Sequence, residues 1–149
     1  MKRLITLILV SAFLICAMTS CKNSGYTGAD VRGVIYTDDF EEGATLIKSY
    51  DEFTSYIESL NDAVYEDVGD VYKYDESYFE NNMLVMIFLT SNSSFNKVSV
   101  KKVEYDGDSV NVILKRKTPK IATNDMVAYI ISVEIEENSD IQNARFSIK

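Results

Sequence analysis

Acidic and aromatic residues alternate in one stretch of the chain, and their types could bind a sugar or perform acid–base chemistry. Between Val64 and Asn82 lie the tyrosines and carboxylates Tyr65, Asp70, Tyr72, Tyr74, Asp75, Glu76 and Tyr78. Tyrosine rings stack on sugars, and two carboxylates about 5 to 10 Å apart can hydrolyse a glycosidic bond. The stretch therefore predicts a candidate carbohydrate site at Tyr72 and Tyr74. The alternative is a solvated loop without a ligand.

A second candidate site is a cluster of positive residues in a chain whose net charge is −8. The cluster consists of Lys97, Lys101, Lys102, Lys115, Arg116, Lys117 and Lys120. The Asp106-Gly107 turn between the two runs predicts a hairpin that brings them side by side. Lys115, Arg116 and Lys117 are thus candidates for binding an acidic protein or a phosphate-rich envelope polymer. The alternative is a solvated strand face whose lysines protect a sheet edge.

Other kinds of chemistry lack the residues they need. The chain has no histidine, and its two cysteines are Cys16 and Cys21. This composition excludes Ser-His-Asp triads, Cys-His pairs and histidine-ligated zinc or haem sites. Calcium could use Asp106 and Asp108 or the acids of residues 66–70, but neither follows the twelve-residue calcium loop. We therefore expect no metal, no cofactor and no enzymatic activity.

The first 21 residues read as a targeting segment. Lys2 and Arg3 precede an apolar run from Leu4 to Met18, which is followed by Thr19-Ser20-Cys21. This order is typical of a secretory signal, and the run is shorter than the roughly 20 residues that span a membrane. The small residues before Cys21 resemble the lipobox of bacterial lipoproteins, which implies that Cys21 becomes the first mature residue and is acylated. The alternative is an ordinary secretory peptide that leaves Cys21 as a free thiol.

These features predict the domain organisation and the partners. We expect a signal peptide over residues 1–20, a glycine-containing tether over 21–29 and one globular domain over 30–149. Without Lys2 and Arg3, the 15 basic residues become 13 against 23 acidic ones, which gives a net charge of −10. Such a charge disfavours nucleic acid and anionic bilayers as partners. We therefore expect a monomer on the outer side of the bacterial cytoplasmic membrane, held there only through lipidated Cys21.

The hydrophobic pattern predicts strands and one clear helix. Short β-branched runs over Val31–Tyr36 and Ala44–Ile47 indicate strands. Ser49 and Glu52 form a capping box, and the apolar residues after it repeat at three-to-four spacing, which predicts a helix up to Val64. A second short helical turn over Asp75–Asn81, capped by Asp75, is expected to follow.

The second half of the chain predicts a sheet. The run Met83–Thr90 is apolar without alternation, which is typical of a central strand covered on both faces. Met126–Ile135 predicts another strand, and Ala144, Phe146 and Ile148 lie on one face of a last one. The fold class is therefore α+β: a mostly antiparallel sheet of about six or seven strands, curled into a sandwich or partly open barrel, with one packed amphipathic helix.

The hairpin register can be predicted from its valines. A two-residue loop at Asp106-Gly107 places Val103 opposite Val110, but the same register carried onward sets valines against lysines. One extra residue at Lys101-Lys102, a β-bulge, removes this conflict. Val100 then lies opposite Val112, and Val98 lies opposite Leu114. Pro119 is expected to end the hairpin, since proline cannot donate to a β-ladder.

The order of motifs from Tyr74 onward resembles small bacterial lipoproteins of unassigned function. It comprises Tyr74 to Asn82, the apolar run, the hairpin, Pro119, Thr123 to Met126 and the strand ending at Ile135. More distantly, it is similar to the PrcB-like C-terminal domain, which is associated with protease-complex subunits. This chain has Ser91 to Phe95 where that family has Gly-Gly-Tyr, so no functional residue is carried over.

These observations together predict a surface-tethered, non-enzymatic binding module. Its ligand would bind at the loops Asp67–Tyr78 and Ile121–Asp125, and the distant resemblance implies that it regulates a protease or another envelope partner. The alternative is a carbohydrate-binding or carboxylate-based hydrolytic protein of the cell surface.

Overall fold

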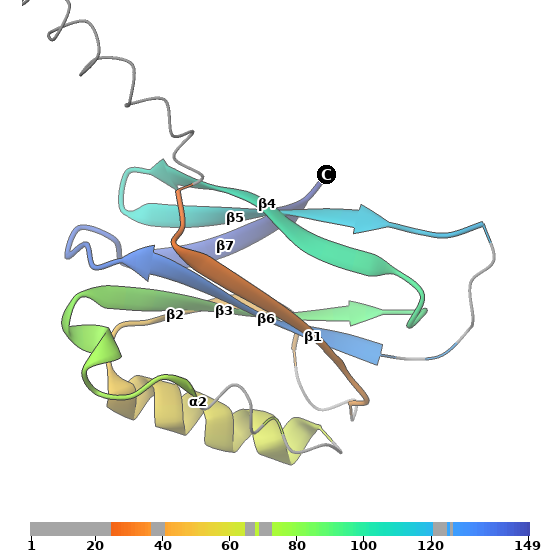
Figure 1. Ribbon diagram of the computed structural model, residues 1–149, viewed down its shortest axis with the longest axis horizontal. Helices are drawn as coiled ribbons and strands as arrows, with labels where there is room; N and C mark the ends of the chain where they lie inside the picture. The colour runs from red at the N-terminus through yellow and green to blue at the C-terminus, as the bar shows by residue number, and fades with distance from the viewer. Residues whose placement is uncertain (1–24, 37–40, 65–67, 69–72, 121–124, 126) are drawn as a thin grey trace, which may run out of the picture.

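Three layers of secondary structure build the fold: one helix, a four-stranded sheet and a three-stranded sheet (Figure 1). The computed structural model describes residues 25–36, 41–64, 68, 73–120, 125 and 127–149. The strand orders are β1-β6-β3-β2 and β4-β5-β7. The elements are β1 (Gly28–Val34), β2 (Gly43–Ile47), α2 (Tyr50–Ala63), the 3₁₀-helix η2 (Tyr78–Glu80), β3 (Asn82–Ser91), β4 (Lys97–Asp106), β5 (Ser109–Lys117), β6 (Val127–Glu136) and β7 (Asn143–Ile148). The predicted α+β class is confirmed as a mostly antiparallel sandwich with one packed helix.

The two central strands, β3 and β6, are covered on both faces, as their apolar sequences predict. Leu84, Met86 and Phe88 of β3 pack in the core that includes α2, whereas Val85 and Ile87 pack in the core between the two sheets. Alternate residues of a strand point to opposite faces, so a strand buried on both sides needs apolar residues throughout. These two cores hold the layers together, and the outer face of the three-stranded sheet carries exposed residues such as Lys97 and Lys115, although Ile113 on the same face is fully buried.

Helix α2 begins at the predicted cap. The backbone N–H of Glu52 donates to the Ser49 hydroxyl over 3.2 Å, and the Glu52 carboxylate accepts from the N–H of Lys48 over 2.7 Å. In a capping box the Glu52 carboxylate would accept from the backbone N–H of Ser49. In the structure its donor is instead the preceding residue, Lys48. Phe53, Ile57 and Leu60 are buried against the four-stranded sheet, which confirms the predicted apolar face.

The folded domain starts before residue 30, because β1 includes residues 28 and 29 of the segment predicted as a tether over residues 21–29. β1 begins at Gly28, which pairs with Glu134 of β6. The preceding Thr27 donates its backbone N–H to the carbonyl of Glu134 over 2.8 Å. The polar, glycine-containing composition predicted a mobile segment, but the ladder with β6 takes up its last residues.

The β4–β5 hairpin has the predicted bulge but a different register. Pairing shifts between Val100 and Lys102, so Lys101 is the extra residue. Asp106 pairs with Ser109, and the loop is Gly107-Asp108 instead of Asp106-Gly107, with Gly107 at φ +60°. Val103 therefore lies opposite Val112, and Val100 opposite Leu114, two residues from the predicted partners. A shift of two residues keeps each side chain on its predicted face.

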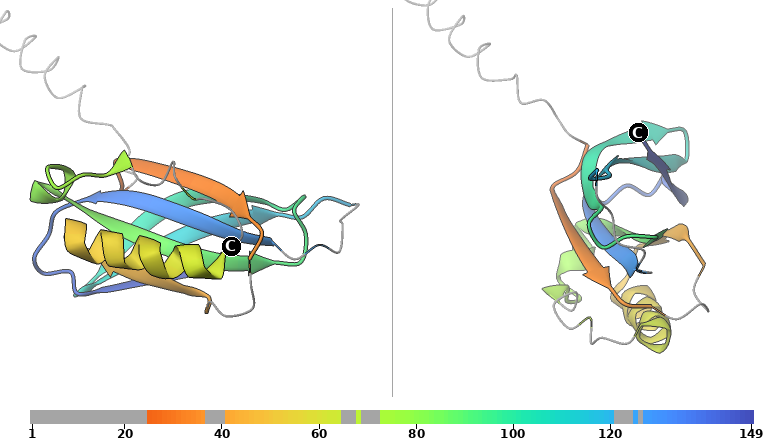
Figure 2. Two further views of the ribbon diagram at one scale, coloured as in Figure 1. Left: turned by 90° about the horizontal axis from the view of Figure 1, so that it is seen from below. Right: turned by 90° about the vertical axis from the view of Figure 1, so that its right-hand side faces the viewer.

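The last strand, β7, completes the outer sheet by pairing in parallel with β5. Its residues Ala144 and Phe146 pack against the core between the sheets, as their alternation predicts. Figure 2 gives two further views of the layers, with α2 on one side of the four-stranded sheet and the β4–β5–β7 sheet on the other. Among the described residues, no helix has the length and apolar character needed to span a membrane.

Candidate functional site

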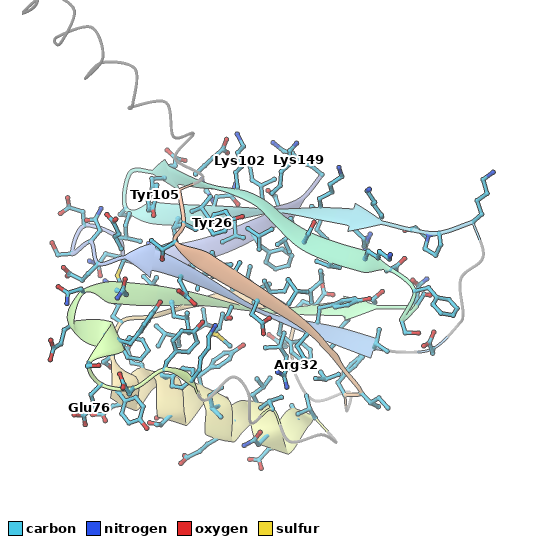
Figure 3. The ribbon with its side chains drawn as sticks, in the orientation of Figure 1. Tyr26, Arg32, Glu76, Lys102, Tyr105 and Lys149 are labelled. Atoms are coloured by element: carbon cyan, nitrogen blue, oxygen red, sulfur yellow. The ribbon has the colours of Figure 1, made fainter. Side chains whose placement is uncertain are left out.

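The hairpin register gathers lysines on the outer face of the three-stranded sheet. Lys97 pairs with Lys117, Ser99 with Lys115, and Lys102 with Ile113. Paired residues share a face, and the neighbouring pairs Val100–Leu114 and Val103–Val112 point inward to the core, so these three pairs point outward. Lys102 and Lys149 lie near each other on the outer side of this sheet (Figure 3). We call Lys97, Lys101, Lys102, Lys115, Lys117 and Lys149 the basic face.

Most of these cations have no acidic partner within the part of the chain that the structure describes. Lys97, Lys101, Lys115 and Lys117 have no ion pair among the described residues, and all four are exposed. Lys102 is the exception, since its ammonium group contacts the Glu104 carboxylate. That contact, together with the charge of Lys149, lowers the pKa of Glu104. Uncompensated positive charges on one face of a sheet create a positive potential that attracts anions.

The two other predicted members of the cluster lie apart from this face. Arg116 pairs with Val98 and so belongs to the opposite side of the hairpin, although its end position leaves it exposed. Lys120 lies beyond the end of β5 and is also exposed. Of the three predicted binding residues here, the structure places Lys115 and Lys117 on one face and Arg116 on the other.

Near the β4–β5 turn, the outer face of the three-stranded sheet carries negative instead of positive charges. Glu104 pairs with Asn111 and Asp106 with Ser109, so both acids point outward near the turn. The guanidinium group of Arg145 on β7 binds the Asp106 carboxylate over 2.7 Å. The positive charge is therefore concentrated at the end away from the turn, as the sequence predicts.

Tyr74 does not present the sugar-binding surface that the sequence predicts. Tyr74 is only 4% exposed, and its ring packs edge-on against the ring of Phe53 at a centroid distance of 5.6 Å. Its hydroxyl donates to the Glu134 carboxylate over 3.0 Å, and burial raises the pKa of that hydroxyl. Lys73 pairs with the same carboxylate over 3.3 Å. These contacts attach the segment before η2 to β6 and leave no ring face for a ligand.

The remaining residues of the predicted carbohydrate site are not assembled into one in the described structure. Asp75 accepts hydrogen bonds from the Ser77 hydroxyl over 2.7 Å and the Tyr78 amide over 3.0 Å, but the N-cap of η2 is Ser77 and the helical turn covers only Tyr78–Glu80 of the predicted Asp75–Asn81. These two bonds lower the pKa of the Asp75 carboxyl group. Glu76 is exposed near α2 (Figure 3). The predictions for Asp70, Tyr72 and Cys21, and for most of the loop 121–125, lie outside the described residues.

The structure contains a polar cleft that the sequence did not predict. It has a volume of about 430 Å³ and is lined by Gly25, Tyr26, Thr27, Tyr105, Glu136, Glu137, Asn138 and Ser139. The hydroxyl of Tyr105 donates to the carbonyl of Gly25 over 2.9 Å, which joins two of its walls. The lining comes from three distant segments of the chain, so no local motif could have indicated it.

No metal-binding geometry is present in the described part of the chain, where no three acidic, histidine or cysteine side chains gather. The carboxylates of the hairpin turn already have other partners. Asp106 binds Arg145, and Asp108 accepts from the side chains of Ser109 and Asn143. Each of these two acids therefore has a partner among the described residues.

Comparison with known proteins supplies no relative for the chain. No family model, no curated protein and no solved structure matches it. A function for the basic face must therefore be inferred from the chemistry of its own residues.

Proposed function

We propose that this protein is a lipid-anchored, non-enzymatic binding module of the bacterial cell surface, and that its basic face binds a polyanionic partner. The observation that carries this proposal is the β4–β5 register, which sets Lys97 beside Lys117 and Ser99 beside Lys115 without an acid in either pair. An acidic protein segment or a phosphate-rich envelope polymer has the complementary charge. The protease-regulating role implied by the distant PrcB-like resemblance would fit an acidic protein segment.

The spacing of the lysines suits a repeating anion. Neighbouring strands lie about 4.8 Å apart, and residues on one face of a strand recur about every 6.6 Å. Lys97, Lys115 and Lys117 therefore form a two-dimensional array of charges within reach of one extended polymer. Several weak ionic contacts add up on such a surface, so binding should be strong at low salt and weak at high salt.

The proposal is tested with inorganic polyphosphate as the probe. We expect the combined change of Lys115→Glu, Arg116→Glu and Lys117→Glu to weaken binding at least about tenfold, since each cation near an anionic surface contributes about 1 kcal/mol. Isothermal titration calorimetry measures the affinity.

Lys48→Glu is the control because Lys48 lies outside the basic face, where its ammonium group binds Gln142. It changes net charge in the same direction by two units, against six for the triple variant, and should leave the affinity within about twofold. Equal affinity of the triple variant and the unmodified protein would disprove polyanion binding at this face.

A second candidate function, carbohydrate binding, is supported by the cleft between Gly25 and Ser139. Tyr26 and Tyr105 provide aromatic rings there, and Glu136 and Glu137 provide hydrogen-bond acceptors. If a sugar binds here, Tyr105→Ala should abolish the binding of chitotetraose, whereas Tyr105→Phe should retain it because the stacking ring remains. Chitotetraose titration followed by NMR distinguishes the two variants, and no shift in the unmodified protein would exclude this ligand.

A further inference from the structure

The chain that leads to the proposed lipid anchor enters the domain beside strand β4, close to the two lysines of the basic face that lie nearest to the β4–β5 turn. Gly25 is the first described residue, and its carbonyl accepts the hydroxyl of Tyr105 on β4. A side chain at Gly25 would approach the Val103 carbonyl to 2.5 Å, so the backbone of Gly25 lies against the same strand. Val103 follows Lys102 and Lys101 in β4. Gly25 is thus within two residues along β4 of Lys101 and Lys102, whereas Lys97, Lys115 and Lys117 lie further along the hairpin, away from the turn.

The tether is too short to move the domain far from the membrane. Four residue steps separate Cys21 from Gly25, and a fully extended chain covers at most about 3.6 Å per residue, or roughly 14 Å in total. An acyl chain on Cys21 would place that residue at the membrane surface. β4 would then lie within about 14 Å of the headgroups.

Opposite sides of the molecule carry opposite charges. Helix α2 has four exposed acids, Asp51, Glu52, Glu58 and Asp62, and no lysine or arginine. It lies on the far side of the four-stranded sheet from the basic face (Figure 1). Glu76 and Glu80 are exposed in the segment that leads to β3. An anionic surface would therefore attract the outer sheet and repel the helix layer, and the tether leaves the domain beside the attracted side.

We infer that the basic face lies on the anionic headgroups of the membrane that holds the Cys21 anchor. This inference rests on the proposed function, and it names phospholipid headgroups as the polyanion. One acyl anchor and one patch of basic residues act together in stable membrane binding, and each lysine near an anionic surface adds roughly fivefold to affinity. The net charge of −10 on the mature chain (13 basic against 23 acidic residues) does not prevent this, because screening over about 10 Å makes the nearest charges decide the interaction. The cleft at Tyr105 would then lie close to the membrane, and α2 would face away from it.

The test attaches the mature chain to vesicles at its own anchor position. Cys21 is the only cysteine after residue 20, so a maleimide-bearing lipid couples to that thiol alone. The vesicles contain phosphatidylcholine alone, or phosphatidylcholine mixed with phosphatidylglycerol at about two to one. Lysines are then acylated with an N-hydroxysuccinimide ester, and the extent of labelling at each lysine is measured by mass spectrometry.

We expect the labelling of Lys97, Lys115 and Lys117 to fall at least threefold on the anionic vesicles, by analogy with the roughly fivefold effect of one surface lysine. Lys48 and Lys73 serve as internal controls, since they bind Gln142 and Glu134 away from this face. Their labelling should be the same on both vesicles. At about 1 M salt, where screening acts over about 3 Å, the protection should disappear.

A variant separates headgroup contact from simple crowding at the vesicle surface. Combining Lys97→Gln, Lys115→Gln and Lys117→Gln should remove the protection of Lys101, Lys102 and Lys149, whereas Lys48→Gln should retain it. Equal labelling of the basic face on both vesicles would overturn the inference.

The same labelling in solution with polyphosphate distinguishes the two proposals. If polyphosphate protects the lysines and anionic vesicles do not, the face binds another polyanion, and only the membrane inference fails. If neither protects them, both proposals are wrong.

Discussion

At the scale of single residues, Gly25 joins the folded domain to the chain that leads to Cys21. Its φ of +77° lies in the left-handed region that side chains disfavour, and a Cβ there would be 2.5 Å from the Val103 carbonyl oxygen. Both observations require glycine at this position. Glycine is therefore needed here for the close contact between this part of the chain and β4.

The first prediction concerns this glycine. Gly25→Ala should lower the free energy of unfolding by about 1 to 2 kcal/mol, because alanine at positive φ is strained and its methyl group meets the backbone of β4. Gly43→Ala is the matched control, since nothing lies within 4 Å of a Cβ there and its φ is not positive. Urea unfolding of both variants measures the difference. If Gly25→Ala is as stable as Gly43→Ala, the tight contact with β4 does not exist in solution.

The second prediction is a pH dependence at Asp75. Two hydrogen bonds lower the pKa of this carboxyl group below its ordinary 3.8. The larger effect comes from the Ser77 hydroxyl and the smaller one from the Tyr78 amide. Because this pKa is lower in the folded than in the unfolded protein, the ionised carboxylate stabilises the fold at pH values above the unfolded pKa. This stabilisation is lost as the pH falls through the folded pKa. Carboxyl chemical shifts should therefore show Asp75 titrating at lower pH than an ordinary aspartate. Ser77→Ala should raise that pKa, and an unchanged titration would show that the predicted bond is absent.

At the scale of elements, the β4–β5 hairpin shows what a sequence pattern can and cannot fix. The bulge was predictable because valines and lysines conflict in any unbroken register. The register itself was wrong by two residues, because Asp106-Gly107 and Gly107-Asp108 are both acceptable two-residue loops. The alternation of inward and outward residues decides the face of each side chain but does not distinguish registers that differ by two.

The third prediction follows from this bulge. Deleting Lys101 should leave a continuous ladder in which Val100 still faces Leu114 and Lys102 still faces Ile113, so the fold should tolerate it. Deleting Ser99 should instead move either Val98 or Val100 out of the core, at a cost of roughly 1.5 kcal/mol or more. Thermal unfolding compares the two deletions. A more severe effect from the loss of Lys101 would contradict the assigned bulge.

The candidate site was predictable where it depended on neighbours along the chain. The lysines gather because one turn folds two adjacent strands together, and a turn signal is local. Tyr74 was misassigned because the acids around it suggested a solvated loop, whereas Phe53 of the distant helix α2 packs against its ring. The cleft at Tyr105 was missed because only the tertiary fold brings Tyr26 and Glu136 to it.

At the scale of the whole molecule, the distribution of charge matters more than its sum. The sequence has a net charge of −8, from which an anionic partner appears unfavourable. The fold separates the charges into an acidic helix layer and a sheet face that carries six lysines. Surface interactions depend on the nearest charges, because salt screens the distant ones. An acidic protein can therefore bind an anion through one face.

The most direct test of polyanion binding is residue-resolved NMR of the mature chain titrated with polyphosphate at low salt. The account predicts that backbone amide shifts change first over Lys97–Lys102 and Leu114–Lys117, and that the changes vanish at about 1 M salt. Amides of α2 should not move, since that layer is acidic and on the opposite side. Changes confined to Tyr26, Tyr105 and Glu136, or no changes at all, would contradict the assignment of the basic face as the binding site.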